Sequence, residues 1–166
     1  MASMSHIEIL LPELRAYSRF ITAGGDDAED LVQDAIVRAL RTPGRPAVLQ
    51  SFRPWMFRVI RNLHYDELRK HRVRREYSDS LARLSRDAPQ TGDPARDVFI
   101  RQAFGKLTPE YREVLFLVDI FGMKYKEAAE VMGVPDGTVM SRISRARRAL
   151  LDLVEGADVD RRNKQA

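Results

Sequence analysis

Residues 125–150 read YKEAAEVMGVPDGTVMSRISRARRAL, and this stretch decides the fold of the C-terminal half. Ala128 and Ala129 are small enough for a second helix to cross closely over the first. Gly133 follows the first helix, where a glycine in the left-handed conformation ends a helix at little cost. The pattern is therefore typical of a helix-turn-helix.

The second helix of this motif has two different faces. Apolar residues at helical spacing predict a core-facing stripe of Val139, Ile143, Ala146 and Leu150. The opposite face carries Gly137, Met140, Ser141, Ser144, Arg145 and Arg148. Arginines and short side chains suit the major groove, because arginine reaches guanine edges or phosphates and serine suits either. A solvated basic face on a helical hairpin is the alternative, but the paired alanines and the glycine turn favour DNA binding.

The elements before this motif are also predicted to be helical. Thr108-Pro109-Glu110 has the order of an N-cap, a first-turn proline and a first-turn acid. The predicted helices are 97–106, 108–121 ending at Gly122, 124–132 and 136–154, with a frayed tail over 161–166.

The N-terminal half begins with a helix whose start is set by Pro12. Because proline fits best in a first turn, the helix is expected to begin near Leu10 rather than Ser5. Asp26 with Glu29 predicts an N-cap and an acidic capping box for the next helix. The apolar stripe of that second helix contains Ala28, Leu31, Val32, Ala35, Ile36, Ala39 and Leu40.

The outer face of this second helix is acidic at its start and basic at its end. Its members are Glu29, Asp30, Gln33, Asp34, Val37, Arg38 and Arg41. Acids at the N-terminus and arginines at the C-terminus match the helix macrodipole, so the charge alone establishes no partner. The sharper hypothesis is a docking surface for a basic protein.

A third helix, predicted from about Ser51 to Arg75, is strongly basic. Its buried stripe is expected to contain Phe52, Trp55, Met56, Val59, Ile60 and Leu63. Another face carries Arg58, Arg61, Asn62, Tyr65, Arg69 and Arg72, with Phe57 at its border. Cations track phosphates while a ring or amide meets an exposed base, so this face suits single-stranded or melted DNA. A solubilising helix face is the alternative.

The expected fold class is all-α, with two small helical domains joined by a flexible linker. Serine, aspartate, proline and glycine gather after the third helix, which marks the linker, with a short helix at 81–84. The predicted domains are 5–75, the linker 76–96, the second domain 97–154 and a tail over 155–166.

Composition limits the function further. The 166 residues carry a net charge of +4 and contain no cysteine, which excludes disulfide scaffolds and thiolate metal sites. His6, His64 and His71 lack the i, i+4 spacing of a helical metal site. No phosphate loop or nucleophile–base set is readable, so neither an enzyme nor a cofactor is expected. With no transmembrane run or signal peptide readable, the expected location is intracellular.

These motifs together resemble an extracytoplasmic-function (ECF, group IV) sigma factor of the sigma-70 family of bacterial RNA polymerase. The resemblance rests on DAEDLVQDAIVRAL, FRPWMFRVIRNLHYDELRKHR and KLTPEYREVLFLVDIFGMKYKEAAEVMGVPDGTVMSRISRARRAL. Two motif sets in this order are far more specific than a lone helix-turn-helix. Met140 departs from the family, which often has a basic residue there.

The resemblance implies roles for the residues singled out above. The first domain would be sigma region 2 and the second sigma region 4. Asp30, Gln33, Asp34 and Arg38 would bind the β′ clamp helices of core RNA polymerase. Arg58, Arg61, Asn62, Tyr65 and Arg69 would contact the −10 element, and the loop 43–51 would capture a flipped base. The outer face of the last helix would read the −35 element, and the end of the second domain would lie near the β flap.

The resemblance also implies a bacterial cytoplasmic protein, an anti-sigma factor as partner and a stress regulon as target. Two alternatives stay open at this stage. One is a sigma-like decoy that binds an anti-sigma factor without touching DNA, and the basic faces argue against it. The other is a helix-turn-helix regulator of the response-regulator type, which would lack the DLVQDA and WMFRVIRN segments.

Overall fold

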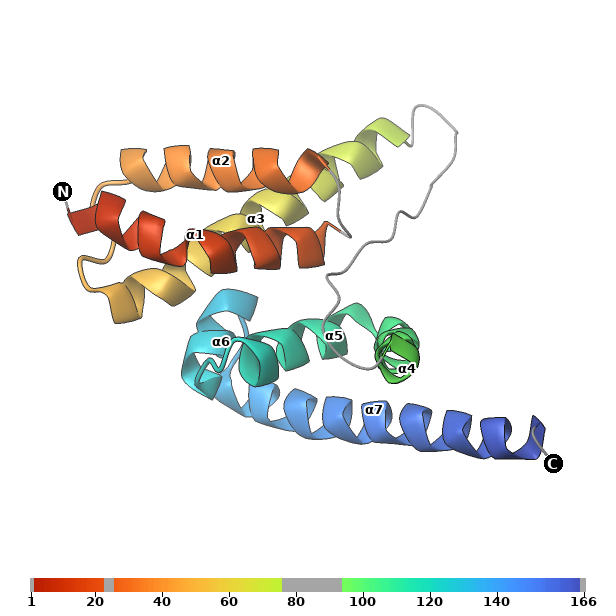
Figure 1. Ribbon diagram of the computed structural model, residues 1–166. Helices are drawn as coiled ribbons and strands as arrows, with labels where there is room; N and C mark the ends of the chain where they lie inside the picture. The colour runs from red at the N-terminus through yellow and green to blue at the C-terminus, as the bar shows by residue number, and fades with distance from the viewer. Residues whose placement is uncertain (1, 23–25, 76–93, 165–166) are drawn as a thin grey trace. The chain divides into compact units, whose positions relative to one another are not determined.

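The computed structural model describes residues 2–22, 26–75 and 94–164, and every element in those ranges is a helix (Figure 1). The predicted all-α fold class is therefore confirmed. The elements are α1 (Ala2–Ile21), α2 (Asp26–Arg41), α3 (Leu49–Arg75), α4 (Pro94–Gly105), α5 (Pro109–Leu115), η1 (Phe116–Ile120), α6 (Tyr125–Met132) and α7 (Asp136–Lys164). The predicted helix at 81–84 and most of the predicted linker lie outside the described residues.

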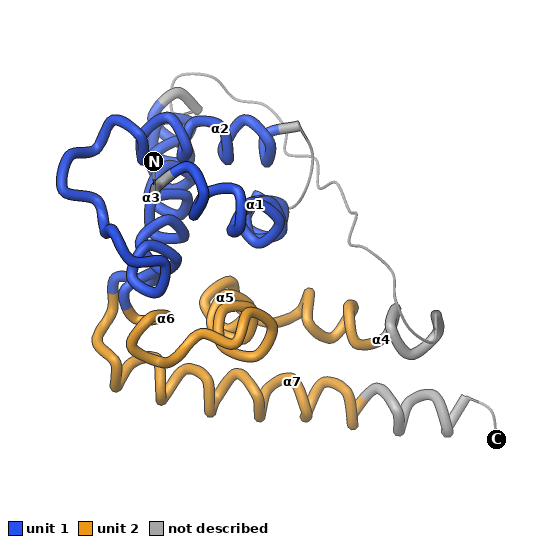
Figure 2. The backbone as a smooth tube through the Cα atoms, turned by 60° about the vertical axis from the view of Figure 1, so that its left-hand side comes forward, with its two compact units in different colours: residues 1–88, 130–133 blue, residues 89–129, 134–166 orange. Residues whose placement is uncertain are grey.

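The chain divides into two compact units, which Figure 2 colours separately. The first comprises residues 1–88 and 130–133, and the second comprises residues 89–129 and 134–166. Among the described helices, none is long and apolar enough to cross a membrane.

Helices α1, α2 and α3 form a bundle in which each helix packs against the other two. The predicted apolar stripes supply its core. The buried residues are Ile7, Leu10, Leu14, Tyr17, Ala28, Leu31, Val32, Ala35, Ala39, Phe52, Met56, Phe57 and Ile60. Leu40 differs from the prediction because it is exposed. Four further members of the predicted stripes are only half-buried: Ile36, Trp55, Val59 and Leu63.

The predicted start of the first helix is wrong. Helix α1 begins at Ala2 and contains Pro12 in its interior. Proline has no N–H to donate to the carbonyl of Glu8, so this position costs a helical hydrogen bond. Pro12 lies on the exposed side of α1, while Ile7, Leu10 and Leu14 are buried on the other side. Burial of that apolar stripe offsets the missing bond.

The predicted N-cap of α2 differs from the structure by one position, because Asp26 is the first residue of the helix. The side chain of Asp26 lies outside the described part of the structure, so the capping box stays a prediction. The Glu29 carboxylate accepts hydrogen bonds from Arg15 of α1, with Nη2–Oε1 at 2.9 Å. Glu29 therefore ties α2 to α1.

In the second unit, α4 and α5 both pack against α7. Helix α4 begins at Pro94 rather than Asp97, which agrees with the tolerance of a first turn for proline. The predicted cap of α5 is confirmed, since the Thr108 side chain accepts from the Tyr111 N–H at 3.3 Å and Pro109 follows it.

Two helix ends in the second unit differ from the prediction. The helix expected to run from Thr108 to Phe121 leaves α geometry at Phe116 and continues as the π-helix η1, before Gly122 ends it with φ +63°. Helix α7 continues to Lys164 instead of ending near Val154, so the helix includes part of the predicted frayed tail. Gly156 does not take the positive φ that would end it.

Candidate nucleic-acid interface

The turn between α6 and α7 has the geometry that the sequence predicts. Gly133 adopts φ +64°, and the N–H of Val134 donates to the carbonyl of Ala129 at 3.1 Å. At the start of α6, the Glu127 carboxylate accepts from the N–H of Lys124 at 2.8 Å. Both ends of this short helix are thus held by hydrogen bonds. The turn fixes where α7 begins.

Helix α7 separates an apolar stripe from a polar face. Val139, Ile143 and Ala146 are buried, as predicted, whereas Leu150 is only half-buried. All six residues of the predicted outer face are exposed: Gly137, Met140, Ser141, Ser144, Arg145 and Arg148. The helix therefore packs through one side and leaves the other side exposed to solvent.

The charged groups on this outer face are available for external contacts. Among the described side chains, Arg145 and Arg148 form no ion pair. Ser141 donates its hydroxyl to the carbonyl of Thr138 at 3.0 Å, which leaves the oxygen able to accept. Uncompensated guanidinium groups beside hydroxyls and a methionine can meet phosphates, base edges and a thymine methyl.

Gly137 stands in the first turn of α7, and nothing lies within 4 Å of the position that a Cβ would occupy. Its φ is not positive, so the backbone does not require glycine. Glycine in a helix is destabilising relative to alanine by about 0.5–1 kcal/mol. Neither packing nor backbone conformation within the protein therefore accounts for this glycine.

The basic face of α3 is also at the surface, and some of its members are already engaged. Arg58, Asn62, Tyr65 and Arg69 are exposed and Arg61 is half-buried. The Arg61 guanidinium lies over the ring of Tyr65, 4.5 Å from its centroid. Arg69 forms an ion pair with Asp66 on the same helix. A cation stacked on a half-exposed ring offers both charge and a flat surface to a base.

Phe57 does not belong to this face. Its side chain is fully buried, and its ring lies 4.9 Å from that of Tyr17 on α1. The prediction that Phe57 borders the basic surface is wrong. Its position along α3 places it on the side that faces α1, where burial of a large ring stabilises the bundle.

The outer face of α2 carries the predicted acidic group. Asp30, Gln33, Asp34 and Arg38 are all exposed, as is the apolar Val37 between them. An acidic surface with an exposed apolar residue can bind a basic, partly apolar protein surface.

The loop after α2 contains a residue that the sequence analysis missed. Arg45 donates from Nη1 to the carbonyls of Leu40 and Thr42, at 3.3 and 3.2 Å. An arginine here satisfies carbonyls at the negative end of a helix. The only sequence signal was its place just after a helix C-terminus.

A second missed group lies beside α7. Arg147 forms a two-point ion pair with Asp119 of η1, with Nη2–Oδ1 at 2.6 Å and Nε–Oδ2 at 3.1 Å.

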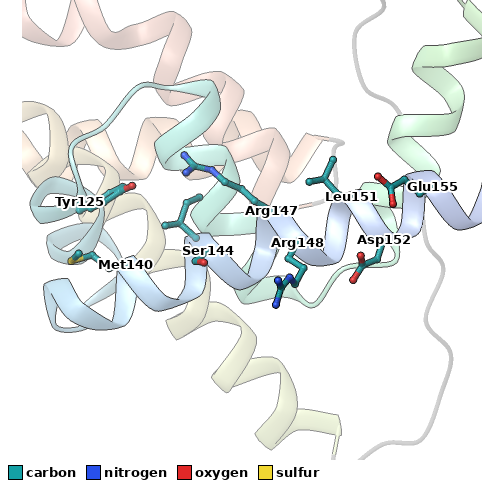
Figure 3. Close-up of a pocket in the computed structure, with 9 residues that line it drawn as sticks. Tyr125, Met140, Ser144, Arg147, Arg148, Leu151, Asp152 and Glu155 are labelled. Atoms are coloured by element: carbon teal, nitrogen blue, oxygen red, sulfur yellow. The ribbon is translucent and has the colours of Figure 1, made fainter.

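An open groove of about 500 Å³ runs along this part of α7 (Figure 3). It is lined by Tyr125, Met140, Ile143, Ser144, Arg147, Arg148, Leu151, Asp152 and Glu155. Within the described ranges, no cluster of His, Asp or Glu could hold a metal ion.

Both halves of the chain match known protein families. Residues 6–74 match Sigma-70 region 2, and residues 100–150 match Sigma-70, region 4. The chain is 37% identical over 158 residues to the ECF RNA polymerase sigma factor EcfG of Rhodopseudomonas palustris (strain TIE-1). That match covers 89% of this chain and 83% of EcfG. SigC, an ECF sigma factor of Mycobacterium tuberculosis, is 32% identical, with 85% and 78% of the two chains covered.

Solved structures show the same likeness. The sigma factor RpoE in complex with the anti-sigma factor NepR, from Bartonella quintana, has a TM-score of 0.74 and 29% identity, covering 92% of this chain and 96% of RpoE. CnrH in complex with the cytosolic domain of CnrY has a TM-score of 0.62 and 30% identity, covering 93% of this chain and 88% of CnrH.

The two units therefore carry the region 2 and region 4 domains of a sigma-70 protein. The chain belongs to the ECF RNA polymerase sigma factors. As an alternative sigma factor it binds core RNA polymerase and promoter DNA and directs transcription initiation, and it is a regulator rather than an enzyme. This assignment replaces the response-regulator alternative, because residues 6–74 match region 2.

Proposed function

We propose that three separate surfaces of this sigma factor divide the work of promoter recognition. The outer face of α7 reads the −35 element, the basic face of α3 contacts the −10 element, and the acidic face of α2 binds the β′ clamp helices of core polymerase. The carrying observation is the exposed outer face of α7, where Arg145 and Arg148 have no ion-pair partner among the described side chains.

The −35 contact is supported by the helix-turn-helix geometry. In this motif the N-terminal part of the second helix enters the major groove. Gly137, Met140, Ser141 and Ser144 occupy that part of α7 and are exposed. Arg145 directly follows Ser144, and Arg148 lies about one turn further along; both reach bases or phosphates.

The −10 contact is supported by the chemistry of α3. Unpairing a base costs a few kcal/mol, which stacking and phosphate contacts must offset. The Arg61–Tyr65 pair offers a stacking surface, and Arg58 and Asn62 add a cation and an amide. The segment 43–51, whose last three residues belong to α3, would receive the flipped base. Its Arg45 donates to the carbonyls of Leu40 and Thr42 at the end of α2.

Regulation by an anti-sigma factor is proposed on the likeness to solved complexes. RpoE is bound to the anti-sigma factor NepR in its structure, and CnrH is bound to the cytosolic domain of CnrY. An inhibitor of this kind would hold the protein inactive in the bacterial cytoplasm until a stress releases it. The target would then be a stress regulon.

The test is transcription in vitro by core polymerase with this protein added. We expect initiation from a discrete set of genomic fragments, with shared −10 and −35 sequences upstream of the mapped start sites. Base changes within either element should reduce initiation while competitor DNA of unrelated sequence has little effect. Binding to core polymerase without initiation from any genomic fragment would instead favour the sigma-like decoy.

A further inference from the structure

We infer that Arg147, although it belongs to the DNA-reading helix, is a positioning residue that fixes the angle of α7 through Asp119 and makes no DNA contact of its own. The inference rests on the proposed role of α7 in reading the −35 element. Its basis is the two-point ion pair that joins the exposed Arg147 guanidinium on α7 to Asp119 on η1.

The ion pair has the geometry of a rigid clamp. Nε and Nη2 of Arg147 each donate to a different oxygen of Asp119, at 3.1 and 2.6 Å. This planar, two-point arrangement fixes orientation as well as distance, which a single charge contact cannot do. Asp119 raises the pKa of Arg147 through these hydrogen bonds, and Tyr125 adds to the effect. The guanidinium thus interacts with residues outside α7 on both η1 and α6.

The π-helix η1 explains how Asp119 reaches Arg147. The N–H of Phe121 donates to the carbonyl of Phe116, five residues back, at 3.0 Å. A π turn holds one more residue than an α turn, and each added residue rotates the following side chains by about 100°. The side-chain directions around Asp119 therefore differ from those of an uninterrupted α-helix. Such interruptions occur frequently at functional sites.

Arg147 and Arg148 are both exposed, but they differ in their ion-pair partners. In Figure 3 the two side chains leave α7 on opposite sides. Arg148 has no ion pair among the described side chains and shares the outer face with Ser144 and Arg145. Arg147 is held by Asp119. Both arginines are exposed and line the same groove, but Arg147 is held by an ion pair, so Arg148 is the one whose guanidinium stays available to DNA.

Loss of the Arg147–Asp119 pair is expected to reduce discrimination between DNA sequences more than it reduces charge-driven binding to DNA. Contacts to base edges need an accurate helix angle, whereas contacts to phosphates tolerate small rotations and carry no sequence information directly. Losing the clamp should therefore lower the preference for the correct −35 sequence while most of the non-specific attraction remains. Lysine at position 147 keeps the charge but cannot form the two-point pair.

The experiment uses the holoenzyme of core polymerase and the full chain, bound to promoter DNA with an intact or a scrambled −35 element. Arg147→Lys, Arg147→Ala and Asp119→Asn should each lower the ratio of the two affinities by about tenfold, which is the scale of one good base contact. The slope of log affinity against log salt should stay unchanged. Arg148→Ala is the matched control, and losing a phosphate contact there should reduce the slope by about 0.9.

A double variant, Asp119→Ala with Arg147→Ala, should lose no more discrimination than either single change, because both remove one interaction. The inference is overturned if Arg147→Ala reduces the salt slope, or if Arg147→Lys and Asp119→Asn keep the full affinity ratio. A parent holoenzyme without any −35 preference would instead refute the proposed function of α7. Thermal unfolding of each variant measures whether the Arg147–Asp119 pair is needed for folding. If unfolding of the variants accounts for the lost discrimination, the inference is also overturned.

Discussion

The guanidinium of Arg15 on α1 holds the carboxylate of Glu29 on α2 at two points, with Nη2–Oε1 at 2.9 Å and Nε–Oε2 at 3.1 Å. The hydrogen bonds from Arg15 lower the pKa of Glu29, while partial desolvation acts in the opposite direction. Glu29 is thereby engaged within the bundle. The exposed acids Asp30 and Asp34 therefore stay available on the outer face of α2, whereas Glu29 does not.

Glu29→Gln should lower the melting temperature slightly at neutral pH, and the difference from the parent should vanish in acid. A carboxylate with a lowered pKa in the folded state stabilises the fold above its unfolded pKa of about 4.3. That contribution is lost as the pH falls through the lowered folded pKa. Thermal unfolding between neutral and strongly acidic pH measures the difference. A difference in melting temperature that stays constant in acid would show that it does not come from the Arg15–Glu29 pair.

Arg145→Ala should weaken recognition of the −35 element by about 1–3 kcal/mol while binding to core polymerase is retained. The side chain is exposed on α7, so its removal leaves the apolar stripe intact. Affinity of the holoenzyme for promoter DNA and affinity of the protein for core polymerase are measured separately. Equal loss in both assays would show that the change acts through the fold.

Asp34→Arg should have the reverse effect. Reversing an exposed charge on the acidic face of α2 places like charges against a basic partner surface, which slows association and lowers affinity for core polymerase. The loss should diminish at high salt, because exposed charges are screened. Glu67→Arg on α3 is a matched charge reversal outside this face. Unchanged core affinity in Asp34→Arg would remove α2 from the polymerase interface.

Gly137→Ala should stabilise the protein and weaken its DNA binding. Alanine in a helix is favoured over glycine by about 0.5–1 kcal/mol, and the added methyl meets nothing within 4 Å. On DNA, the same methyl would stand at the N-terminal part of α7, where the backbone approaches the groove closely. Melting temperature and promoter affinity should therefore move in opposite directions. An increase in both would show that Gly137 is not at the DNA surface.

Phe57→Ala should destabilise the protein by about 3–5 kcal/mol, as expected for removing a buried aromatic ring. The ring is fully buried and contacts Tyr17, so its role lies in the bundle. Tyr65→Ala on the same helix removes a half-exposed ring and should change stability little while reducing melted-strand binding. Chemical denaturation of the two variants separates these roles. A loss of DNA affinity in Phe57→Ala without loss of stability would contradict the assignment of Phe57 to the core.

The sequence predicts the helical elements well because apolar spacing is local information. The stripe of α2 and the turn at Gly133 depend on residues a few positions apart, and both appear where expected, apart from Leu40 at the end of the stripe. The stripe of α3 differs more from its prediction. Phe57 is fully buried and Trp55 only half-buried, because the packing against α1 decides which side of the helix faces the core.

The features that the sequence does not reveal depend on tertiary contacts. Arg147 and Asp119 are far apart along the chain, and a π turn that no local pattern signals changes the facing of Asp119. Pro12 lies inside α1 because burial along the helix outweighs its local penalty. Helix propensity alone favours a later start of α1. Only the packed core of α1, α2 and α3 shows that burial outweighs the cost of the proline.

The separation of α7 into a packed stripe and an unpacked face has an evolutionary consequence. The α7 residues that would select a promoter lie outside the packed interior of the second unit, so they can change without a penalty in folding. One scaffold can therefore diverge into many paralogues with different target genes. The promoter preference of such a protein is therefore constrained by the promoters in its genome and hardly at all by its own folding stability.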